Sequence, residues 1–210
     1  GQGQNNIDIA HRRKILKSKD NKKSCIFVEK YIVNPEQLIA KYYQPDSGLY
    51  HILITHSRAV SQKALEVANN HPELNADLQF IEEAALLHDI GIYLCNAPRI
   101  LCTGSHHYLE HGYLGADLLL SEGFPRHALV CERHTGVGIS LEQIVSRNLP
   151  LPHRDMRPVS IEEQIICYAD KFYSKTELHT EHSMERILTS LRHHGDENVD
   201  IFRNWHERFK

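Results

Sequence analysis

The stretch Leu86-Leu87-His88-Asp89-Ile90-Gly91 decides how this sequence is interpreted. It ends an apolar segment with two adjacent side chains that can ligate a metal ion, and a glycine that can stop a helix follows them. Adjacent residues on a helix point about 100° apart, so His88 and Asp89 can reach one ion only where the helix ends. An ion there would explain a charged carboxylate directly after an apolar run. Alone, the pair is weak evidence, because His-Asp pairs more often cap helices or lie at surfaces.

Three histidines elsewhere in the chain fall on or next to predicted helices. His56 lies on the i, i+4 face of an otherwise apolar helix, a pattern that a histidine packed in the core would also give. His111 shares a helix face with small residues such as Gly115, which let another helix or a substrate approach closely. Helix packing alone explains His111 equally well. His134 precedes the glycine-containing turn 135–138, which is suited to placing a ligand at a helix end.

Asp170 is a carboxylate inside a predicted apolar helix. An unpaired buried carboxylate costs several kcal/mol, so Asp170 needs a cation partner, either a metal ion or a base such as Lys171 or Arg133. Each of five predicted helices would then supply one or two ligands, as a helical bundle needs to hold a metal in its core. In chain order the candidate metal ligands are His56, His88, Asp89, His111, His134 and Asp170.

Helix signals dominate the rest of the chain. Asn34 to Gln37 combines a capping side chain with proline at the first helical position. Ser140 with Gln143, and Ser160 with Glu163, have the spacing of a capping box. We therefore expect helices to begin at these three places.

Gly91 and Gly123 are plausible helix stops. Alternating strand patterns are absent, apart from an ambiguous stretch at 25–28. We predict an all-α fold, a single helical bundle with its metal site in the core. The predicted helices lie near residues 35–43, 47–69, 77–89, 106–122, 125–134, 140–147, 160–176, 181–193 and 197–208.

Composition excludes several classes of protein. The chain has 210 residues, 41% of them hydrophobic, which is enough for a core and too many for a disordered tail. Its five cysteines form no CxxC pair, so neither a zinc ribbon nor a disulfide framework is expected. No apolar run reaches the roughly 18 residues of a membrane helix. We expect a cytoplasmic protein with reduced thiols and no membrane contact.

Charge is distributed unevenly around a formal net value of −3. Residues 1–24 hold seven basic and two acidic side chains, a net charge of +5, which leaves −8 for residues 25–210. A basic arm could touch nucleic acid, but it has no interleaved aromatic residues for base stacking, so a solvated, partly frayed N-terminus is expected. The acidic body argues against a general nucleic-acid binder.

The ordered pattern H, HD, H, H, D resembles the HD-domain metal-dependent phosphohydrolases, in the subgroup with two extra histidines. The resemblance covers about residues 50–178, and the tetrapeptide His88 to Gly91 together with Ala169-Asp170 makes it specific. It implies an HD domain over residues 25–210 with a C-terminal helical extension, and a binuclear centre for two divalent transition metal ions: Mn, Fe, Co, Ni or Zn.

The resemblance also implies a division of the ligands. His56, His88, Asp89 and Asp170 would hold one ion, and Asp89, the candidate catalytic residue, would bridge to a second ion held by His111 and His134. Two ions about 3.5–4 Å apart can share a water, lower its pKa and clamp a phosphoryl group. The implied activity uses a metal-activated hydroxide to cleave a phosphoester or phosphoanhydride of a small phosphorylated metabolite or nucleotide.

The subtype is narrowed by comparison with three groups of the superfamily. Ile92 stands where the cyclic-dinucleotide group has lysine, and the GYP signature of that group is absent after His134, which argues against cyclic di-GMP hydrolysis. The turn after His134 is similar to that of the dinucleoside tetraphosphate hydrolases, which also have lysine where Ile92 stands. The likeness is greatest to small uncharacterised HDIG proteins with an ERH-G-G turn and a PxRDxxP loop, here 132–138 and 152–158.

Candidate phosphate ligands follow from their positions near these motifs. Arg133 precedes a metal ligand, Arg154 lies in the proline-rich loop, and Lys171 follows Asp170. Arginine can bind phosphate bidentately and lysine acts as a point charge. For each of them, pairing with a nearby acid is at least as good an explanation.

Two other functions remain open at this point. The same scaffold could hold a redox di-iron centre of an oxygenase, or the chain could be a non-catalytic metal-binding regulatory protein. The sequence leaves open whether the protein forms a homodimer, which metals it binds and which phosphorylated substrate it takes.

Overall fold

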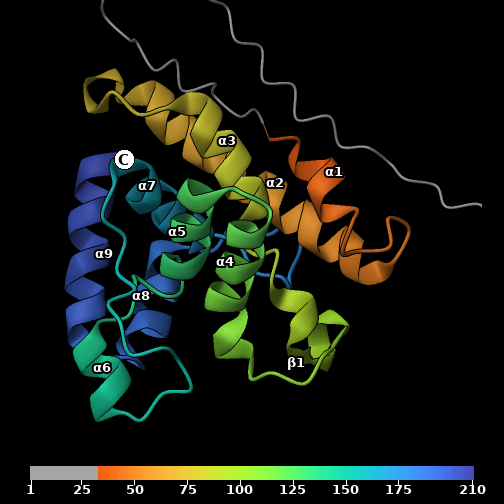
Figure 1. Cartoon of the computed structure of the whole chain (residues 1–210). Coiled ribbons are helices and arrows are strands. Elements are labelled where there is room, and N and C mark those ends of the chain that lie inside the picture. The colour runs from red at the N-terminus through yellow and green to blue at the C-terminus, as the bar shows by residue number, and fades with distance from the viewer. Residues whose placement is uncertain (1–32) are drawn as a thin grey trace, which may run out of the picture. The chain divides into compact units, whose positions relative to one another are not determined.

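The computed structural model describes residues 33–210, and α-helices and short 3₁₀ turns make up more than half of them (Figure 1). The predicted all-α class is confirmed. The basic arm at 1–24 and the ambiguous stretch at 25–28 lie outside the described residues. The α-helices are α1 (Pro35–Ile39), α2 (Gly48–Asn70), α3 (Leu78–Leu87), α4 (His111–Ser121), α5 (Pro125–Arg133), α6 (Leu141–Ser146), α7 (Ile161–Asp170), α8 (Met184–Arg192) and α9 (Asp196–Phe209).

The three predicted capping positions begin helices as expected. Asn34 Oδ1 accepts a hydrogen bond from the backbone N–H of Gln37 at 3.0 Å, at the start of α1. Ser140 and Gln143 form a complete capping box at α6. Ser160 accepts from the backbone N–H of Glu163 at 3.1 Å, at the start of α7. Each cap satisfies a backbone donor that the first helical turn leaves without a partner.

Three predicted helices differ from the observed ones. α1 ends at Ile39 rather than near residue 43. The helix expected over 106–122 begins as a short 3₁₀ turn, η4 (Tyr108–Glu110), and becomes α-helical only at His111. α7 ends at Asp170, six residues before the predicted end, because the backbone N–H groups of the next three residues donate to carbonyl oxygens three positions back. This early end redirects the chain after Asp170.

Gly91 does not act as the predicted helix stop. α3 already ends at Leu87, and the φ of Gly91 is an ordinary −82°. A Cβ atom at Gly91 would lie 2.3 Å from the backbone oxygen of His111 and 2.5 Å from the backbone nitrogen of Gly115. Glycine here allows α4 to approach the turn after α3. The other predicted stop, Gly123, is confirmed: it follows α4 with a φ of +86°.

A short β-hairpin interrupts the helices and was not predicted. β1 (Asn96–Ala97) pairs antiparallel with β2 (Cys102–Thr103), between the 3₁₀ turns η2 (Ile92–Leu94) and η4; η3 (Pro98–Ile100) lies in its loop. Strands of two residues are too short to show an alternating pattern.

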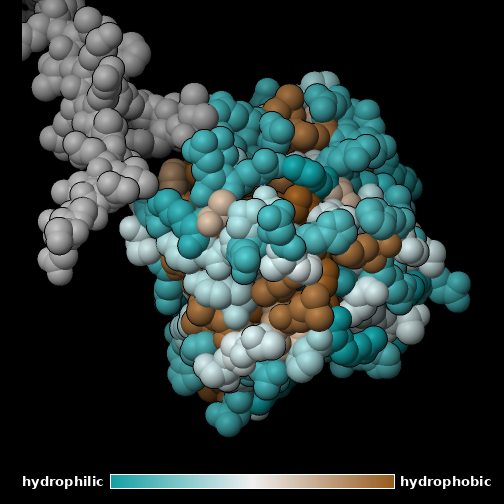
Figure 2. Space-filling view, turned by 90° about the vertical axis from the view of Figure 1, so that its right-hand side faces the viewer, coloured by the Kyte–Doolittle hydropathy of each residue, from teal (hydrophilic) through white to brown (hydrophobic). Residues whose placement is uncertain are grey.

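Two main hydrophobic clusters support the bundle. One gathers apolar side chains of α2, α3, α7, α8 and α9, around fully buried residues such as Ile165 and Phe202. The other joins α1 and α4 to α2, α3 and α5, around Leu53 and Leu119. On the face in Figure 2, hydrophobic residues reach the surface in several places, each bordered by hydrophilic ones. No helix within residues 33–210 has the length and apolar character needed to cross a membrane.

Candidate metal centre

The six predicted ligands come from five separate segments and meet inside the bundle. His56 lies within α2, His111 begins α4, and Asp170 ends α7. His88 with Asp89, and His134, directly follow the ends of α3 and α5. Helix ends therefore place most of the donor atoms. All six ligand residues are buried, and none of the six is more than 8% exposed.

One group of donors surrounds Asp89 Oδ2. This oxygen lies 2.9 Å from His88 Nε2 and 3.1 Å from His56 Nε2. Asp170 Oδ1 completes the group, at 3.0 Å from His56 Nε2 and 3.4 Å from His88 Nε2. Candidate ligand atoms of these four residues all lie within 4.8 Å of one another, close enough to surround a single ion. We call them site A.

A second group of donors surrounds the other oxygen of the same carboxylate. Asp89 Oδ1 lies 3.3 Å from His111 Nε2 and 3.4 Å from His134 Nε2. The two Nε2 atoms are 3.0 Å apart. We call this group site B. Asp89 thus turns one oxygen towards each site, which is the arrangement that the resemblance implied for a bridging carboxylate.

Backbone carbonyls fix the orientation of three imidazoles. The Nδ1 atoms of His88, His111 and His134 donate to the carbonyl oxygens of the residues three positions earlier, at 2.6, 2.6 and 2.7 Å. A carbonyl oxygen can only accept, so Nδ1 carries a proton in each of these rings, and the neutral form of the ring presents the lone pair of Nε2. At site B two such lone pairs would face each other. A cation between them removes this conflict, as it does for metal-bound histidines that donate through the other nitrogen.

Polar atoms in the centre lack the partners that buried groups normally have. Among the described residues, neither ring nitrogen of His56 nor Nε2 of His88 makes a hydrogen bond of acceptable geometry. The oxygens of Asp89 make none either, although Oδ2 has an ion-pair contact with Lys175. Native structures leave few buried polar groups without partners. The residues therefore fit divalent ions, and mixed imidazole and carboxylate donors suit Mn, Fe, Co, Ni or Zn.

Local electrostatics keep both carboxylates ionised. Burial alone would raise the pKa of Asp89, but His88 and Lys175 hold it well below its usual value. Asp170 follows the same pattern, with Lys171 as the largest opposing influence on its pKa. Burial lowers the pKa of His134 to about 4, so this ring is neutral near pH 7. Ionised carboxylates and a neutral imidazole are the forms that bind metal ions.

Lys175 is a functional candidate that sequence reasoning missed. Its Nζ lies 2.6 Å from Asp89 Oδ2, and its side chain is only 12% exposed. The early end of α7 brings it there, in place of the helix expected through residue 176. Lysine is seldom buried without a partner. The available signal was the segment 171–176, which carries two lysines and no acid directly after a buried aspartate.

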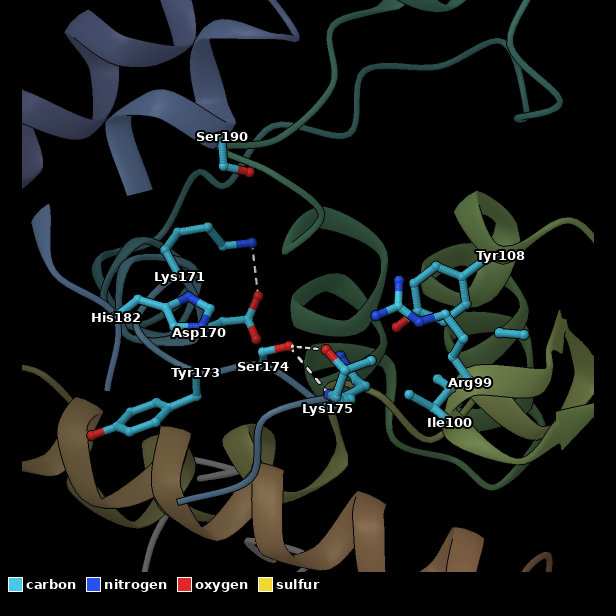
Figure 3. Close-up of a pocket in the computed structure, with 12 residues that line it drawn as sticks. Arg99, Ile100, Tyr108, Asp170, Lys171, Tyr173, Ser174, Lys175, His182 and Ser190 are labelled. Carbon is cyan, nitrogen blue, oxygen red and sulfur yellow. Dashed lines mark hydrogen bonds and ion pairs between the residues drawn. The ribbon is translucent and has the colours of Figure 1, made fainter. Parts of the chain in front are cut away.

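The three predicted phosphate ligands have different surroundings. Lys171 lines a cavity beside Asp170 (Figure 3). Its Nζ forms an ion pair with Asp170 Oδ2 at 2.7 Å. Arg133 instead pairs with Glu163 at 3.0 Å, and Arg154 pairs with Glu132. Both arginines thus pair with a nearby acid, which was the alternative to a role in phosphate binding. Neither arginine lines that cavity.

Other histidines have structural partners. His107 caps η4, and His106 lies 3.2 Å from Glu110. His127, for which the sequence suggested no role, is buried 3.2 Å from Glu83 and packs edge-on against Phe80. His182 lines the cavity beside Asp170; its buried Nε2 makes no hydrogen bond to any described residue and lies 3.9 Å from Glu177 Oε2.

Metal binding at site A is expected to release a proton from His88. Burial lowers the pKa of this ring, but Asp89 and Asp170 raise it to about 9 overall. Near pH 7.5 the ring is protonated, and a ligating Nε2 must lose that proton, so about one proton should leave. Near pH 10 the ring is already neutral and this release should vanish. Calorimetric titration with Mn²⁺ in two buffers of different ionisation enthalpy measures it. Equal release at both pH values would contradict the assignment of His88.

Comparison with known proteins assigns the segment that contains the candidate ligands to a family. The HD domain family matches residues 53–174, more than half of the chain and nearly the range that the motifs indicated. The segment begins in α2 before His56 and ends after Asp170, so it contains every candidate metal ligand. The chain belongs to the HD domain family.

Three archaeal proteins are similar to the chain. An uncharacterised protein of Methanocaldococcus jannaschii is 35% identical over 121 residues, which are 56% of this chain and 64% of that protein. Two proteins named tRNA (cytidine(56)-2'-O)-methyltransferase also match. That of Thermoplasma volcanium is 31% identical over 82% of this chain and 42% of its own length. The protein of Picrophilus torridus is 32% identical over 69% of this chain and 38% of its own length.

The chain thus spans less than two thirds of the length of each of these relatives. No solved structure matches it significantly.

Proposed function

We propose that the chain is a metal-dependent phosphohydrolase with a binuclear centre, acting on a phosphoester or phosphoanhydride of a small phosphorylated metabolite or nucleotide. The observation that carries this proposal is the position of Asp89. Its two carboxylate oxygens face two separate groups of histidines, inside a domain of the HD family. Such a carboxylate can hold two cations close together, as phosphoryl transfer by two metal ions requires.

The proposed reaction is hydrolysis at phosphorus. When bound, two divalent ions would lower the pKa of a water molecule and neutralise charge on the phosphoryl oxygens. The water oxygen bonds to phosphorus, the bond from phosphorus to the leaving oxygen breaks, and one proton of the water ends on the leaving group.

The side chains described above would orient the reactants. The backbone-anchored imidazoles of His88, His111 and His134 fix where the donor atoms point, so the centre is preorganised. Tyr108 lines the adjoining cavity, and burial raises the pKa of its hydroxyl to about 12. It therefore stays protonated near pH 7 and can donate a hydrogen bond to a phosphate oxygen.

A second candidate substrate is a phosphate ester on RNA. The observation in its favour is that two relatives are named tRNA (cytidine(56)-2'-O)-methyltransferase, each matching more than two thirds of this chain. The acidic body of the chain argued against general nucleic-acid binding, so we infer a role for RNA only as the carrier of a phosphate group.

A phosphate-release screen tests the proposed function. Nucleotides, dinucleoside polyphosphates, sugar phosphates and RNA oligonucleotides with a 5'-phosphate, a 3'-phosphate or a 2',3'-cyclic phosphate are offered with Mn, Co, Ni, Fe and Zn in turn. Chromatography of the products is added for the dinucleoside polyphosphates and the cyclic phosphate, whose hydrolysis can proceed without releasing inorganic phosphate. Release of phosphate from one class, absent in the Asp89→Asn protein, is the expected result. Two redox-active irons, consumption of O₂ and no phosphate from any substrate would favour the oxygenase. Metal binding without any turnover would favour a regulatory protein.

The two sites are expected to lose metal separately. His111→Ala and His134→Ala each remove a donor of site B and should each lose about one equivalent of metal, while His56→Ala should disturb the ion of site A. Elemental analysis of the purified proteins measures this. His153→Ala, which alters a histidine outside both sites, is the control and should keep the wild-type metal content. Unchanged metal content in both site B variants would mean a mononuclear centre.

A further inference from the structure

The cavity beside Asp170 is open to a ligand and rich in positive charge. It has a volume of about 380 Å³, at the lower end of the range of small-molecule sites. Lys171 and Asp170 lie on one side of it, and Arg99 and Tyr108 on the other, with Lys175 between them (Figure 3). Asp170, a candidate metal ligand of site A, is one of the residues that line the cavity. A molecule bound in the cavity therefore lies next to site A.

With His88 deprotonated, as metal binding requires, the charges of the protein's own groups in the centre are balanced. Asp89 and Asp170 contribute two negative charges, and the ammonium groups of Lys175 and Lys171 lie 2.6 and 2.7 Å from them. Two divalent ions would add four positive charges to these buried residues. Uncompensated charge in a buried site is strongly unfavourable. The loaded centre therefore favours a ligand that brings more than one negative charge.

Lys175 would compete directly with a metal ion. Its Nζ contacts the Asp89 oxygen that also lies 2.9 Å from His88 Nε2, so an ion bound at site A would share that oxygen with an ammonium group. Like charges at such short range repel strongly. Because Lys175 also lines the cavity, its flexible side chain can turn towards an anion bound there.

Arg99 supplies a charge that has no close acidic partner; its more distant effect is to help lower the pKa of Glu177. Arg99 is exposed at the edge of the cavity and forms no ion pair with any residue of the described part of the chain. A guanidinium can bind two oxygens of one phosphate at once. Arg99 lies on η3, between the ligand pair His88 and Asp89 and the ligand His111, but it belongs to no recognised motif and was not predicted.

We propose that this cavity binds a phosphate group carrying two negative charges, through Lys175, Lys171 and Arg99, and that the substrate is a phosphomonoester or the terminal phosphate of an anhydride rather than a phosphodiester. The inference rests on the proposed function and names the substrate class of the same site. The dianionic phosphate could belong to a free nucleotide or to the end of an RNA chain, which present the same chemistry.

Binding of inorganic phosphate to the Mn²⁺-loaded full chain tests the cavity without requiring turnover. Calorimetry on Lys175→Gln and on Arg99→Gln should show phosphate binding about 10- to 100-fold weaker than in the wild type, the effect of losing one charge-assisted hydrogen bond. Lys175→Gln should bind Mn²⁺ more tightly, because it removes a competing charge. A merely structural role would not move the two affinities in opposite directions. Arg203→Gln, an exposed arginine of α9, is the control and should leave both affinities unchanged.

Two results would overturn the proposed cavity. One is a phosphate affinity equal to that of the wild type in both single variants, Arg99→Gln and Lys175→Gln. The other, should Lys175→Gln fail to fold, is wild-type affinity in Arg99→Gln alone, since this exposed residue can be changed without disturbing the core. Nucleoside 5'-monophosphate and a 5'-phosphorylated RNA oligonucleotide are then added as competitors. Displacement of phosphate by one of them supports the proposal and identifies the source, whereas displacement by neither overturns it.

Hydrolysis of a matched pair of esters tests the preference for a dianion. The monoester p-nitrophenyl phosphate should be cleaved with a kcat/KM at least about 10-fold above that of bis(p-nitrophenyl) phosphate, because the diester brings only one negative charge. Equal rates, or a faster diester, would overturn the substrate class. Failure of the proposed function is a different result: no phosphate is released from any substrate, while phosphate binding still depends on Lys175 and Arg99.

Discussion

Replacing Asp89 by asparagine is expected to remove both metal ions and to lower turnover by about 10³-fold or more, the scale seen when a group that stabilises transition-state charge is lost. The reason is geometric, because Oδ2 belongs to site A and Oδ1 to site B. An asparagine keeps one neutral oxygen and replaces the other by an amide nitrogen, which cannot bind a cation. Elemental analysis and phosphate release measure the two effects on one preparation.

Asp89→Asn should also weaken the metal-free protein. The substitution leaves the ammonium of Lys175 buried without the carboxylate that lies 2.6 Å away. Breaking one partner of a buried ion pair costs about 3–5 kcal/mol. Asp155→Asn is the matched control, because Asp155 pairs with Arg157 at the surface, where an ion pair is worth at most about 1 kcal/mol. Denaturant unfolding of both variants measures the difference in the free energy of unfolding.

Two outcomes would contradict this prediction. If Asp89→Asn kept about one equivalent of metal, the carboxylate would serve one site and the bridging role would be wrong. If it lost metal but kept its rate of phosphate release, the activity would lie elsewhere in the chain.

The sequence was most informative where a residue type is chemically required. Only a few side chains bind transition metals, so six histidines and aspartates in a recognisable order predicted donors that the fold brings into two groups, with the ligand atoms of each group within 4.8 Å of one another. Capping residues were equally informative, because Asn34, Ser140 and Ser160 act within their own helical turns. Both kinds of signal are local or belong to a known pattern.

Features set by tertiary contacts were missed. The end of α7 at Asp170 carries no glycine or proline signal, so the helix was predicted to continue for six more residues. No role was predicted for Lys175, whereas the turn after Asp170 buries it against Asp89. Arg133 and Arg154 were predicted as phosphate ligands from their positions beside the motifs, and this stays a prediction. Arg99 lines the cavity but was not predicted, because position along the chain says little about which cation faces a cavity.

Gly91 shows how a correct residue can be given the wrong reason. The position was taken as a helix stop, for which glycine offers a positive φ, yet its φ of −82° suits any residue. What excludes a side chain is the backbone of α4, at 2.3 Å from the oxygen of His111 and 2.5 Å from the nitrogen of Gly115. The last glycine of the motif therefore sets the distance between site A, beside α3, and the histidine that begins α4.

Gly91→Ala is accordingly expected to destabilise the protein by about 3 kcal/mol or more, at the upper end of overpacking effects, because both contacts are with backbone that cannot rotate away. The added methyl group should push His111 from Asp89, so the folded fraction should lose the metal of site B and keep that of site A. Gly123→Ala is the matched control: it strains a φ of +86° but meets no atom within 4 Å, so it should cost about 1–2 kcal/mol and leave both metals in place. Denaturant unfolding and metal analysis on both variants separate packing from backbone strain. Equal losses of stability, with full metal content in both, would show that Gly91 does not position α4.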